Sequence, residues 1–453
     1  MNKTETLAAS DTDTLSDGQT DSQIDIAAIE AYESKAYRYY VLAILTVVYA
    51  FNFIDRQLLV ILQEPIKAEL GFSDTQLGLL TGFAFVVFYV ICGIPIARWA
   101  DRANRRSIIA AALAAWSVMT ALSGLAQNYT QMVLARIGVG IGEAGGSPPS
   151  HSMISDMFPP NKRATALAIY GSGVYLGILA GYVIGGWLSE SLGWRTTFLV
   201  VGLPGVLLAI LVRLTIKEPP RGFSQGVAAA DGPPMSSIKE VLFVLWSRPT
   251  FRHLCVAAGA QGFVGYGLSN WMPSYYLRTF EISLPELGTW LGLVTGFAGI
   301  VGALLGGYLV DRLGERDLRW RLWLPAIALC LSLPVIFATL NSQNVYASLL
   351  LYGLPIALIA VYVGPVLATT HNLVGMRMRA LSSAILFLII NMIGLGLGPL
   401  AVGFLSDQLA PHAGDGALRL AILTVVSVGT VWSCIHYVLA ARTLSEDLSN
   451  APD

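Results

Sequence analysis

Acidic and basic residues interrupt two apolar stretches in the first third of the chain. Asp55 and Arg56 stand side by side between "YYVLAILTVVYAF" and "LLVIL", and a later apolar run contains Arg136 and Glu143. Seven residues turn a helix by about 700°, so Arg136 and Glu143 face the same way. A carboxyl group changes its proton affinity when an arginine partner leaves, and a freed guanidinium can hold a carboxylate or phosphate. Two interpretations are open: a structural cluster of ion pairs that neutralises the buried charges, or proton coupling at Asp55 and Glu143 with substrate binding at Arg56 and Arg136. We favour the second.

The chain around these charges has the composition of a membrane protein. It contains 453 residues, of which 55% are hydrophobic and 13% are charged, whereas soluble domains carry about 25% charged residues. A membrane helix needs about 20 mostly apolar residues, and we count twelve such stretches. The near-neutral net charge argues against a nucleic-acid partner. The four cysteines lie apart without the spacing of a metal site.

The distribution of positive charge predicts how the chain is oriented. Most of the 28 Lys and Arg residues fall in loops on the same side as the N-terminus, and the opposite loops contain only Lys67, Arg195, Arg278 and Arg419. Positively charged loops mark the cytoplasmic side of a membrane. We therefore expect both termini to be cytoplasmic, in a multi-pass protein of a bacterial inner membrane.

A polar stretch over residues 218–249 divides the predicted spans into two sets of six. It is rich in Pro, Gly and Ala, as linkers are, and ends in "VLFVLWS", which can form a short surface helix. We expect a disordered acidic tail over 1–36, helix bundles over 37–217 and 250–442, and a C-terminal tail over 443–453. The predicted fold class is an all-α membrane protein with twelve transmembrane helices in two six-helix bundles.

The two halves share a charged motif after their second span. The first copy, "ARWADRANRR", contains Asp101, Arg102 and Arg105, and the second, "GYLVDRLGER", contains Asp311, Arg312 and Arg316. The second copy matches the cytoplasmic signature of the major facilitator superfamily, so residues 37–442 resemble a transporter of that superfamily. The first copy departs from the signature at Ala97, Trp99 and Asn104. The resemblance implies that the charged residues of both copies form a conformational latch, which closes the cytoplasmic side in the outward-facing state.

The first and fourth predicted spans resemble the spinster branch of this superfamily. The segment "NFIDRQ" and the run from Arg136 to Gly177 carry this resemblance. It implies proton-coupled transport of sphingolipids or lysophospholipids by alternating access. The anion:cation symporter branch, which takes sugar acids with protons, shares both charged pairs, so these pairs do not separate the branches. The apolar, glycine-rich cavity helices favour an amphipathic cargo.

The C-terminal half offers uncharged polar residues in its spans. We expect Asn270 and Asn391 to bind the substrate together with the two arginines. The expected partners are an amphipathic lipid or a small organic anion and the membrane lipids. We expect no metal and no cofactor other than the coupling proton, and a monomer. A lipid receptor that does not transport is the alternative from another class, although a static binder needs no latch. No pattern of residues indicates an enzyme.

Overall fold

Helices and short connections make up the part of the chain that the computed structural model describes, which is residues 26–225, 238–375 and 378–450. No β-strand occurs among these residues. A helix satisfies its own backbone hydrogen bonds, so an apolar chain made of helices suits a bilayer. The expectation of an all-α architecture is confirmed for these residues.

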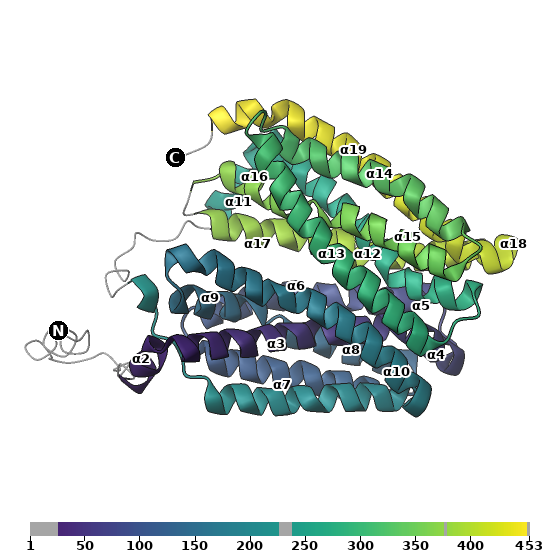
Figure 1. The fold of residues 1–453 in the computed structure, drawn as a ribbon, viewed down its shortest axis with the longest axis horizontal. Helices are drawn as coiled ribbons and strands as arrows, with labels where there is room; N and C mark the ends of the chain where they lie inside the picture. Colours follow the sequence, from purple (N-terminus) through teal and green to yellow (C-terminus); the bar gives the residue numbers. More distant parts are fainter. Residues whose placement is uncertain (1–25, 226–237, 376–377, 451–453) are drawn as a thin grey trace, which may run out of the picture.

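The first half of the chain forms one bundle, drawn from purple to teal in Figure 1. Within it, α10 packs along α3 and α7, and α7 also packs against α8. Its elements are α2 (Ile26–Glu33), α3 (Lys35–Ile61), α4 (Gln63–Leu70), α5 (Asp74–Gly78), the π-helical turn η1 (Leu79–Phe83), α6 (Ala84–Ala100), α7 (Arg105–Ser123), α8 (Tyr129–Glu143), α9 (Ser147–Met157) and α10 (Pro160–Thr215).

The second half forms the other bundle, in which α12 packs along α19 and α14 packs against α15. It follows the 3₁₀ turn η2 (Phe223–Gln225), and α11 contains the residues expected to form the short surface helix. Its elements are α11 (Ile238–Ser247), α12 (Pro249–Thr279), α13 (Leu284–Gly314), α14 (Trp320–Asn341), α15 (Val345–Ala360), α16 (Val363–Asn372), α17 (Arg379–Ile390), the π-helical turn η5 (Asn391–Leu397), α18 (Gly398–Ala413), the 3₁₀ turn η6 (Gly414–Gly416) and α19 (Ala417–Ser449).

The two bundles meet along two seams. On one seam α10 packs against α13, and on the other α5 and η1 pack against α18 and η5. Small residues permit this approach: a Cβ atom on Gly288 would lie 2.3 Å from the carbonyl oxygen of Tyr182, and one on Gly78 would lie 2.4 Å from that of Pro399. Both π-helical turns lie at the second seam, and such turns are often found at functional sites.

Eight stretches of the described residues are long and apolar enough to cross a membrane. Two of them, Pro160–Thr215 with 56 residues and Leu381–Ser449 with 69 residues, exceed the length of one span. Gly193 divides the first, because its φ of 75° and ψ of 159° lie outside the helical region. The twelve-span count stays a prediction, because α8, with 15 residues, and α12 are not among the eight stretches.

Both ends of the described chain lie at the same end of the molecule. The helix α2 and the last turns of α19 are on the left in Figure 1, where α6 and α13 also end. We call this the basic end, because Arg102, Arg105 and Arg312 lie there. The other end, where α4 and α5 lie, is called the opposite end.

Helical structure extends into both predicted tails. Within the expected disordered tail, Ile26–Glu33 forms α2, because Tyr32 is buried and its hydroxyl donates to the carbonyl oxygen of Lys217 at 2.6 Å. Burial raises the pKa of Tyr32, which keeps this donor protonated. At the other terminus α19 continues to Ser449, beyond the expected end of the bundle at 442. Residues 1–25 of the first tail and 226–237 of the linker lie outside the described residues.

Candidate substrate and ion site

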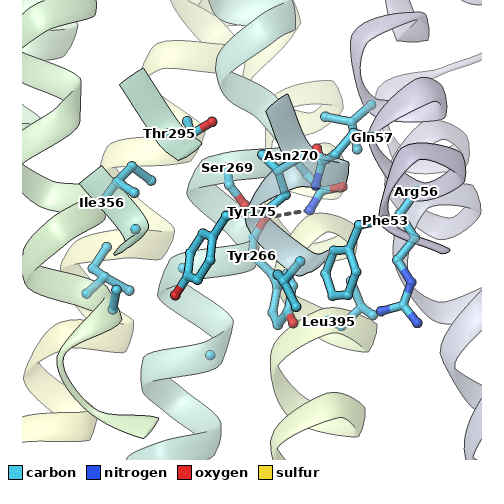
Figure 2. A pocket seen from close by; sticks show the side chains of 18 of the residues that line it. Phe53, Arg56, Gln57, Tyr175, Tyr266, Ser269, Asn270, Thr295, Ile356 and Leu395 are labelled. Carbon is cyan, nitrogen blue, oxygen red and sulfur yellow. Dashed lines mark hydrogen bonds between the residues drawn. The ribbon is translucent and has the colours of Figure 1, made fainter. Parts of the chain in front are cut away.

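A cavity of about 300 Å³ lies between the two bundles. The first half contributes Arg56 and Arg136 to its wall, and the second half contributes uncharged polar groups: Gln261, Tyr266, Ser269, Asn270, Thr295 and Tyr362. Apolar side chains fill much of the remaining wall, among them Phe53, Ile356 and Leu395, which Figure 2 shows around the polar groups. Most ligand pockets have apolar walls with a few polar groups, and this cavity has both.

Arg56 forms the ion pair of the cavity wall. Its Nη2 lies 2.7 Å from Oε2 of Glu143, and its Nε donates to the same oxygen at 2.8 Å. The guanidinium carbon also lies 4.7 Å from the centre of the Phe85 ring. Glu143 is only 1% exposed, and a charge buried to this degree needs a partner. This ion pair therefore connects Asp55 and Arg56 on α3 with Arg136 and Glu143 on α8.

Asp55 and Arg136 are buried without such partners. Asp55 is 1% exposed and Arg136 is 2% exposed. Neither carboxylate oxygen of Asp55 has a hydrogen-bond partner within the described part of the chain, and neither do Nε and Nη1 of Arg136. Arg136 lines the cavity, whereas Asp55 does not. Arg56 and Glu143 thus neutralise each other in an ion pair. Asp55 and Arg136 form no ion pair and retain side-chain atoms without hydrogen-bond partners.

The two asparagines expected at the substrate differ in position. Asn270 lines the cavity, and its side chain donates to the carbonyl oxygen of Tyr266 at 3.0 Å, as Figure 2 shows. Asn391 is not among the lining residues, because it begins the π-helical turn η5 and donates to its own helix, to the carbonyl oxygen of Phe387 at 2.8 Å. The structure therefore does not bring Asn391 to this cavity. Leu395, one turn later, takes that place.

Most of the predicted latch residues are exposed at the basic end. Among the described residues, no ion pair joins the two copies of the motif. Arg105 differs, because it is fully buried and pairs with Asp156 and, at 2.7 Å, with Glu218. It fastens the chain that follows α10 to α7 and α9. The exposed latch residues are Asp101, Arg102, Asp311, Arg312 and Arg316.

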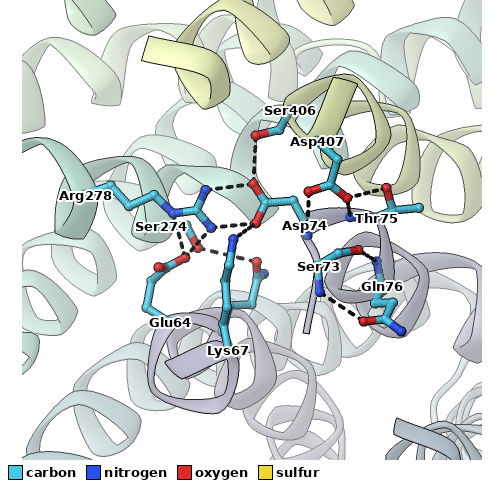
Figure 3. A network of polar contacts seen from close by, with 11 residues as sticks. Glu64, Lys67, Ser73, Asp74, Thr75, Gln76, Ser274, Arg278, Ser406 and Asp407 are labelled. Carbon is cyan, nitrogen blue, oxygen red and sulfur yellow. Dashed lines mark hydrogen bonds and ion pairs between the residues drawn. The ribbon is translucent and has the colours of Figure 1, made fainter. Parts of the chain in front are cut away.

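A charged network joins the bundles at the opposite end (Figure 3). Arg278 of α12 lies 2.7 Å from Glu64 of α4 and 2.7 Å from Asp74 of α5. Lys67 and Ser406 also donate to Asp74. This network closes the opposite end, and we call it the opposite-end network.

Asp407 extends the opposite-end network by capping a helix of the other bundle. One of its oxygens accepts from the backbone N–H of Asp74 at 3.1 Å, and the other accepts from that of Thr75 at 2.8 Å. A carboxylate at a helix N-terminus satisfies free N–H groups and offsets the helix dipole. The sequence analysis missed these residues. Their one signal was that Lys67 and Arg278 belong to the few cations predicted outside the cytoplasm.

The described residues offer no cluster of three or more His, Cys, Asp or Glu side chains that could hold a metal ion. The charged groups of the cavity wall are two arginines, Arg56 and Arg136.

Comparison with known proteins agrees with this architecture. The family model described as "Major Facilitator Superfamily" matches residues 45–444. An MFS-type efflux pump of Mycolicibacterium smegmatis is 36% identical over 410 residues, which are 89% of this chain and 93% of that protein. A probable L-galactonate transporter of Escherichia coli is 29% identical over 275 residues, 57% of this chain and 58% of that one.

A solved structure is similar over nearly the whole chain. It is a bacterial homologue of the human lysosomal transporter spinster, in an inward-facing and unoccupied conformation. It is 31% identical, has a TM-score of 0.80, and the match covers 91% of this chain and 99% of that chain. The predicted resemblance to a spinster-like transporter is confirmed, and so is the expectation that the chain is not an enzyme. This chain belongs to the major facilitator superfamily and is a multi-pass integral membrane protein of the transporter class.

Proposed function

We propose that this transporter moves an amphipathic organic anion, of the lysophospholipid or sphingolipid class, together with protons. One observation carries the proposal: Arg136 is 2% exposed, its Nε and Nη1 have no acceptors among the described residues, and it lines a largely apolar cavity. A buried guanidinium has a strong need for an acceptor, and carboxylate and phosphate groups accept two of its hydrogen bonds at once. The apolar wall then accommodates the hydrocarbon part of the cargo.

Proton coupling would reside in Asp55 and Glu143. Glu143 is held by Arg56, while Asp55 lies close by without a partner. An anion that draws Arg136 or Arg56 toward the cavity removes positive charge from the carboxylates and so favours their protonation. A proton that crosses a potential of 100 mV supplies about 2.3 kcal/mol. Asp55 and Glu143 would thus link cargo binding to the proton gradient in a protein of the bacterial inner membrane.

Alternating access would use the two ends of the molecule in turn. If the basic end is cytoplasmic, the opposite-end network closes the outer side here while the latch residues are apart. Opening the outer side requires the interactions of Arg278 and Asp407 to break and the predicted latch to form at the basic end. Transporters with paired repeats rock their bundles around a fixed site in this way.

A sugar acid is the second candidate cargo. The cavity volume of about 300 Å³ lies at the lower end of the range for ligand pockets, which suits a small anion. The hydroxyl and amide groups of the second half, such as Ser269 and Asn270, could bind sugar hydroxyls. The similarity to a probable L-galactonate transporter supports this candidate as well.

Uptake by proteoliposomes tests the proposal. Purified protein is reconstituted, and uptake of a labelled lysophospholipid and of galactonate is measured with and without an imposed pH gradient. We expect gradient-dependent uptake of the lysophospholipid, and a loss of about 10- to 100-fold in Arg136→Ala, since a hydrogen bond to a charged group contributes about 1.5–3 kcal/mol. The control is Arg213→Ala, which removes an exposed arginine far from the cavity wall.

Each outcome separates the candidates. Uptake of galactonate alone would replace the lipid by a sugar acid. Saturable binding without uptake would favour the receptor alternative. Equal uptake by Arg136→Ala and Arg213→Ala would refute the role of Arg136.

A further inference from the structure

A layer of uncharged polar groups lies between the cavity and the opposite-end network. Gln63, the first residue of α4, donates from its side-chain amide to the carbonyl oxygen of Asn270 on α12 at 2.9 Å, and its own side-chain oxygen accepts from the hydroxyl of Ser274 at 3.4 Å. Gln63 and Ser274 are no more than 1% exposed, and Asn270 is 6% exposed. These contacts join the first bundle to the second, so they have to break when the bundles separate at this end.

The spacing of residues along α12 places this layer next to the charged one. Asn270, Ser274 and Arg278 follow one another at intervals of four residues, so they lie on one face of the helix. Arg278 pairs with Glu64, the neighbour of Gln63 in the chain (Figure 3). The side chains of Arg278 and Glu64 are 23% and 21% exposed, whereas Gln63 is fully buried. The charged layer is thus partly open to solvent, and the uncharged layer is sealed from it on the side of the cavity, which Asn270 lines.

Pro273 interrupts the hydrogen bonds of α12 at the same level. A proline has no backbone N–H, so the carbonyl oxygen of Ser269 lacks its usual partner in the helix. The hydroxyl of Tyr182, on α10 of the first bundle, reaches this oxygen at 3.5 Å. The first bundle therefore donates to two successive carbonyl groups of α12, those of Ser269 and Asn270. Helices bend at such prolines, so these two donors fix how α12 is held there.

Cargo in the cavity would act on this part of α12. Three residues named above line the cavity, namely Tyr182, Ser269 and Asn270, and Gln63 lies outside the lining. A cargo oxygen can accept from the Tyr182 hydroxyl and from the Asn270 amide, which in the empty cavity donates to the Tyr266 carbonyl oxygen at 3.0 Å. The Ser269 carbonyl then loses its donor, and α12 can shift at the proline. The bond from Gln63 to the neighbouring carbonyl group weakens with that shift.

We propose that Gln63 is a positioning residue for transport, which couples the occupancy of the cavity to the closure of the opposite end through the backbone of Asn270. With the cavity empty, the Gln63 bond keeps α12 against the first bundle. With cargo bound, this bond weakens and the population that is open at the opposite end rises. The inference rests on the proposed function for the cargo, whereas the contact that holds the end closed does not depend on it.

Distances between the bundles test this coupling. Spin labels are attached at Glu190 and Asn341, exposed residues of the two bundles, in the full chain with its four native cysteines replaced by alanine. Double electron–electron resonance in nanodiscs gives the ratio of open to closed molecules without cargo, with lysophosphatidylglycerol and with galactonate. We expect the bound anion to raise this ratio in the chain that is otherwise unsubstituted. A fall in the ratio would contradict the proposed direction of coupling.

Gln63→Met removes the amide and retains the length of the side chain. We expect the cargo-free ratio to rise about fivefold, which is the size expected for the loss of one hydrogen bond, and cargo to have little further effect. Gln131→Met is the matched control. Gln131 also lies at the opposite end, but its side-chain oxygen accepts from the backbone N–H of Gln127 at 2.7 Å, within the first bundle. This control should leave the cargo-free ratio and the cargo response unchanged.

Arg278→Ala separates coupling from the stability of the closed end. This variant weakens the charged layer and keeps the Gln63 bond. Its cargo-free ratio should rise, and cargo should raise it further by the same factor as in the unsubstituted chain. A full cargo response in Gln63→Met would refute the coupling role. A cargo-free ratio of Gln63→Met equal to that of Gln131→Met would refute the closing contact.

The outcomes also separate this inference from the proposed function. If neither lysophosphatidylglycerol nor galactonate bound, the proposed function would fail, while a raised cargo-free ratio in Gln63→Met would still support Gln63 as a residue that closes the opposite end. If an anion bound and changed the distance equally in Gln63→Met and in the unsubstituted chain, only the coupling role of Gln63 would fail.

Discussion

At the scale of single residues, the two arginines of the cavity wall differ in their partners. Nη2 of Arg56 forms an ion pair with Oε2 of Glu143 at 2.7 Å, and its guanidinium carbon lies 4.7 Å from the centre of the Phe85 ring. Arg136 lies 5.6 Å from the same ring and has no acceptor among the described residues. Arg56 is thus tied to the fold, whereas the hydrogen-bond donors of Arg136 remain available to a ligand. The two residues should therefore respond differently to substitution.

We expect Arg56→Gln to destabilise the protein more than Arg136→Gln does. Loss of Arg56 leaves the Glu143 carboxylate buried without its ion-pair partner, which costs about 3–5 kcal/mol. Loss of Arg136 breaks no ion pair or hydrogen bond among the described residues and takes away only its longer-range attraction for the two carboxylates, so its cost should be smaller. The thermal midpoints of the purified variants measure both effects.

A double substitution is the control for this comparison. Replacing Arg56 and Glu143 together by glutamine removes both charges, so most of the lost stability should return. If Arg136→Gln proved the more damaging of the two single changes, the assignment of partners would be wrong.

At the scale of elements, the closed end depends on interactions between the bundles. Arg278 of α12 holds Glu64 of α4 and Asp74 of α5, each at 2.7 Å, and Asp407 of α18 caps the first turn of α5. Glycines on the two seams let the backbones touch. The close backbone contacts fix how the two bundles fit together. The charged groups add interactions between the bundles that can break together.

We expect Arg278→Ala to shift the population toward a state that is open at the opposite end. The substitution removes charge-assisted hydrogen bonds that contribute about 1.5–3 kcal/mol, so the equilibrium should move by at least about tenfold. Spin labels at Glu190 and Asn341, exposed residues of the two bundles, report the separation of the bundles at this end. A longer distance is the expected result.

Arg195→Ala is the matched control for that experiment. Arg195 pairs with Glu69 at 2.8 Å at the same end, but both residues belong to the first bundle. Its loss should leave the distance between the labels unchanged. An equal change in both variants would mean that the opposite-end network does not hold the bundles together.

At the scale of the whole molecule, the two ends are in different states. The opposite end is joined by ion pairs between the bundles, whereas the latch residues of the basic end other than Arg105 are exposed, and no ion pair among the described residues links the two motif copies. The similar solved structure is described as inward-facing. A cytoplasmic basic end would make this structure inward-facing too.

Reporter fusions test that orientation. With the basic end in the cytoplasm, we expect green fluorescent protein at the C-terminus to fluoresce. Alkaline phosphatase inserted after Phe280, in the loop between α12 and α13, should be active, because this enzyme works outside the cytoplasm. The reverse pattern would show that the basic end faces outward, against the distribution of positive charge.

Hydropathy and repeated motifs were sufficient to predict the kind of protein. Each apolar stretch must satisfy its own backbone hydrogen bonds in a bilayer, so composition alone predicts helices. The repeated Asp-Arg motif after the second span of each half indicates the superfamily. Asp55, Arg56, Arg136 and Glu143 could also be singled out, because charges are rare in membrane helices.

Only the tertiary structure decided which of these residues meet. Arg278 and Glu64 are 214 residues apart in the chain, and no local pattern reveals that two helices cross at that point. The pairing of Arg56 with Glu143, the free donors of Arg136 and the displacement of Asn391 from the cavity depend on how each helix is rotated about its axis. The spacing of apolar residues and the composition of a segment determine that a helix forms and which of its faces is apolar. Its neighbour and its rotation follow from packing against the rest of the molecule, since the free energy of each contact depends on residues far away in the sequence.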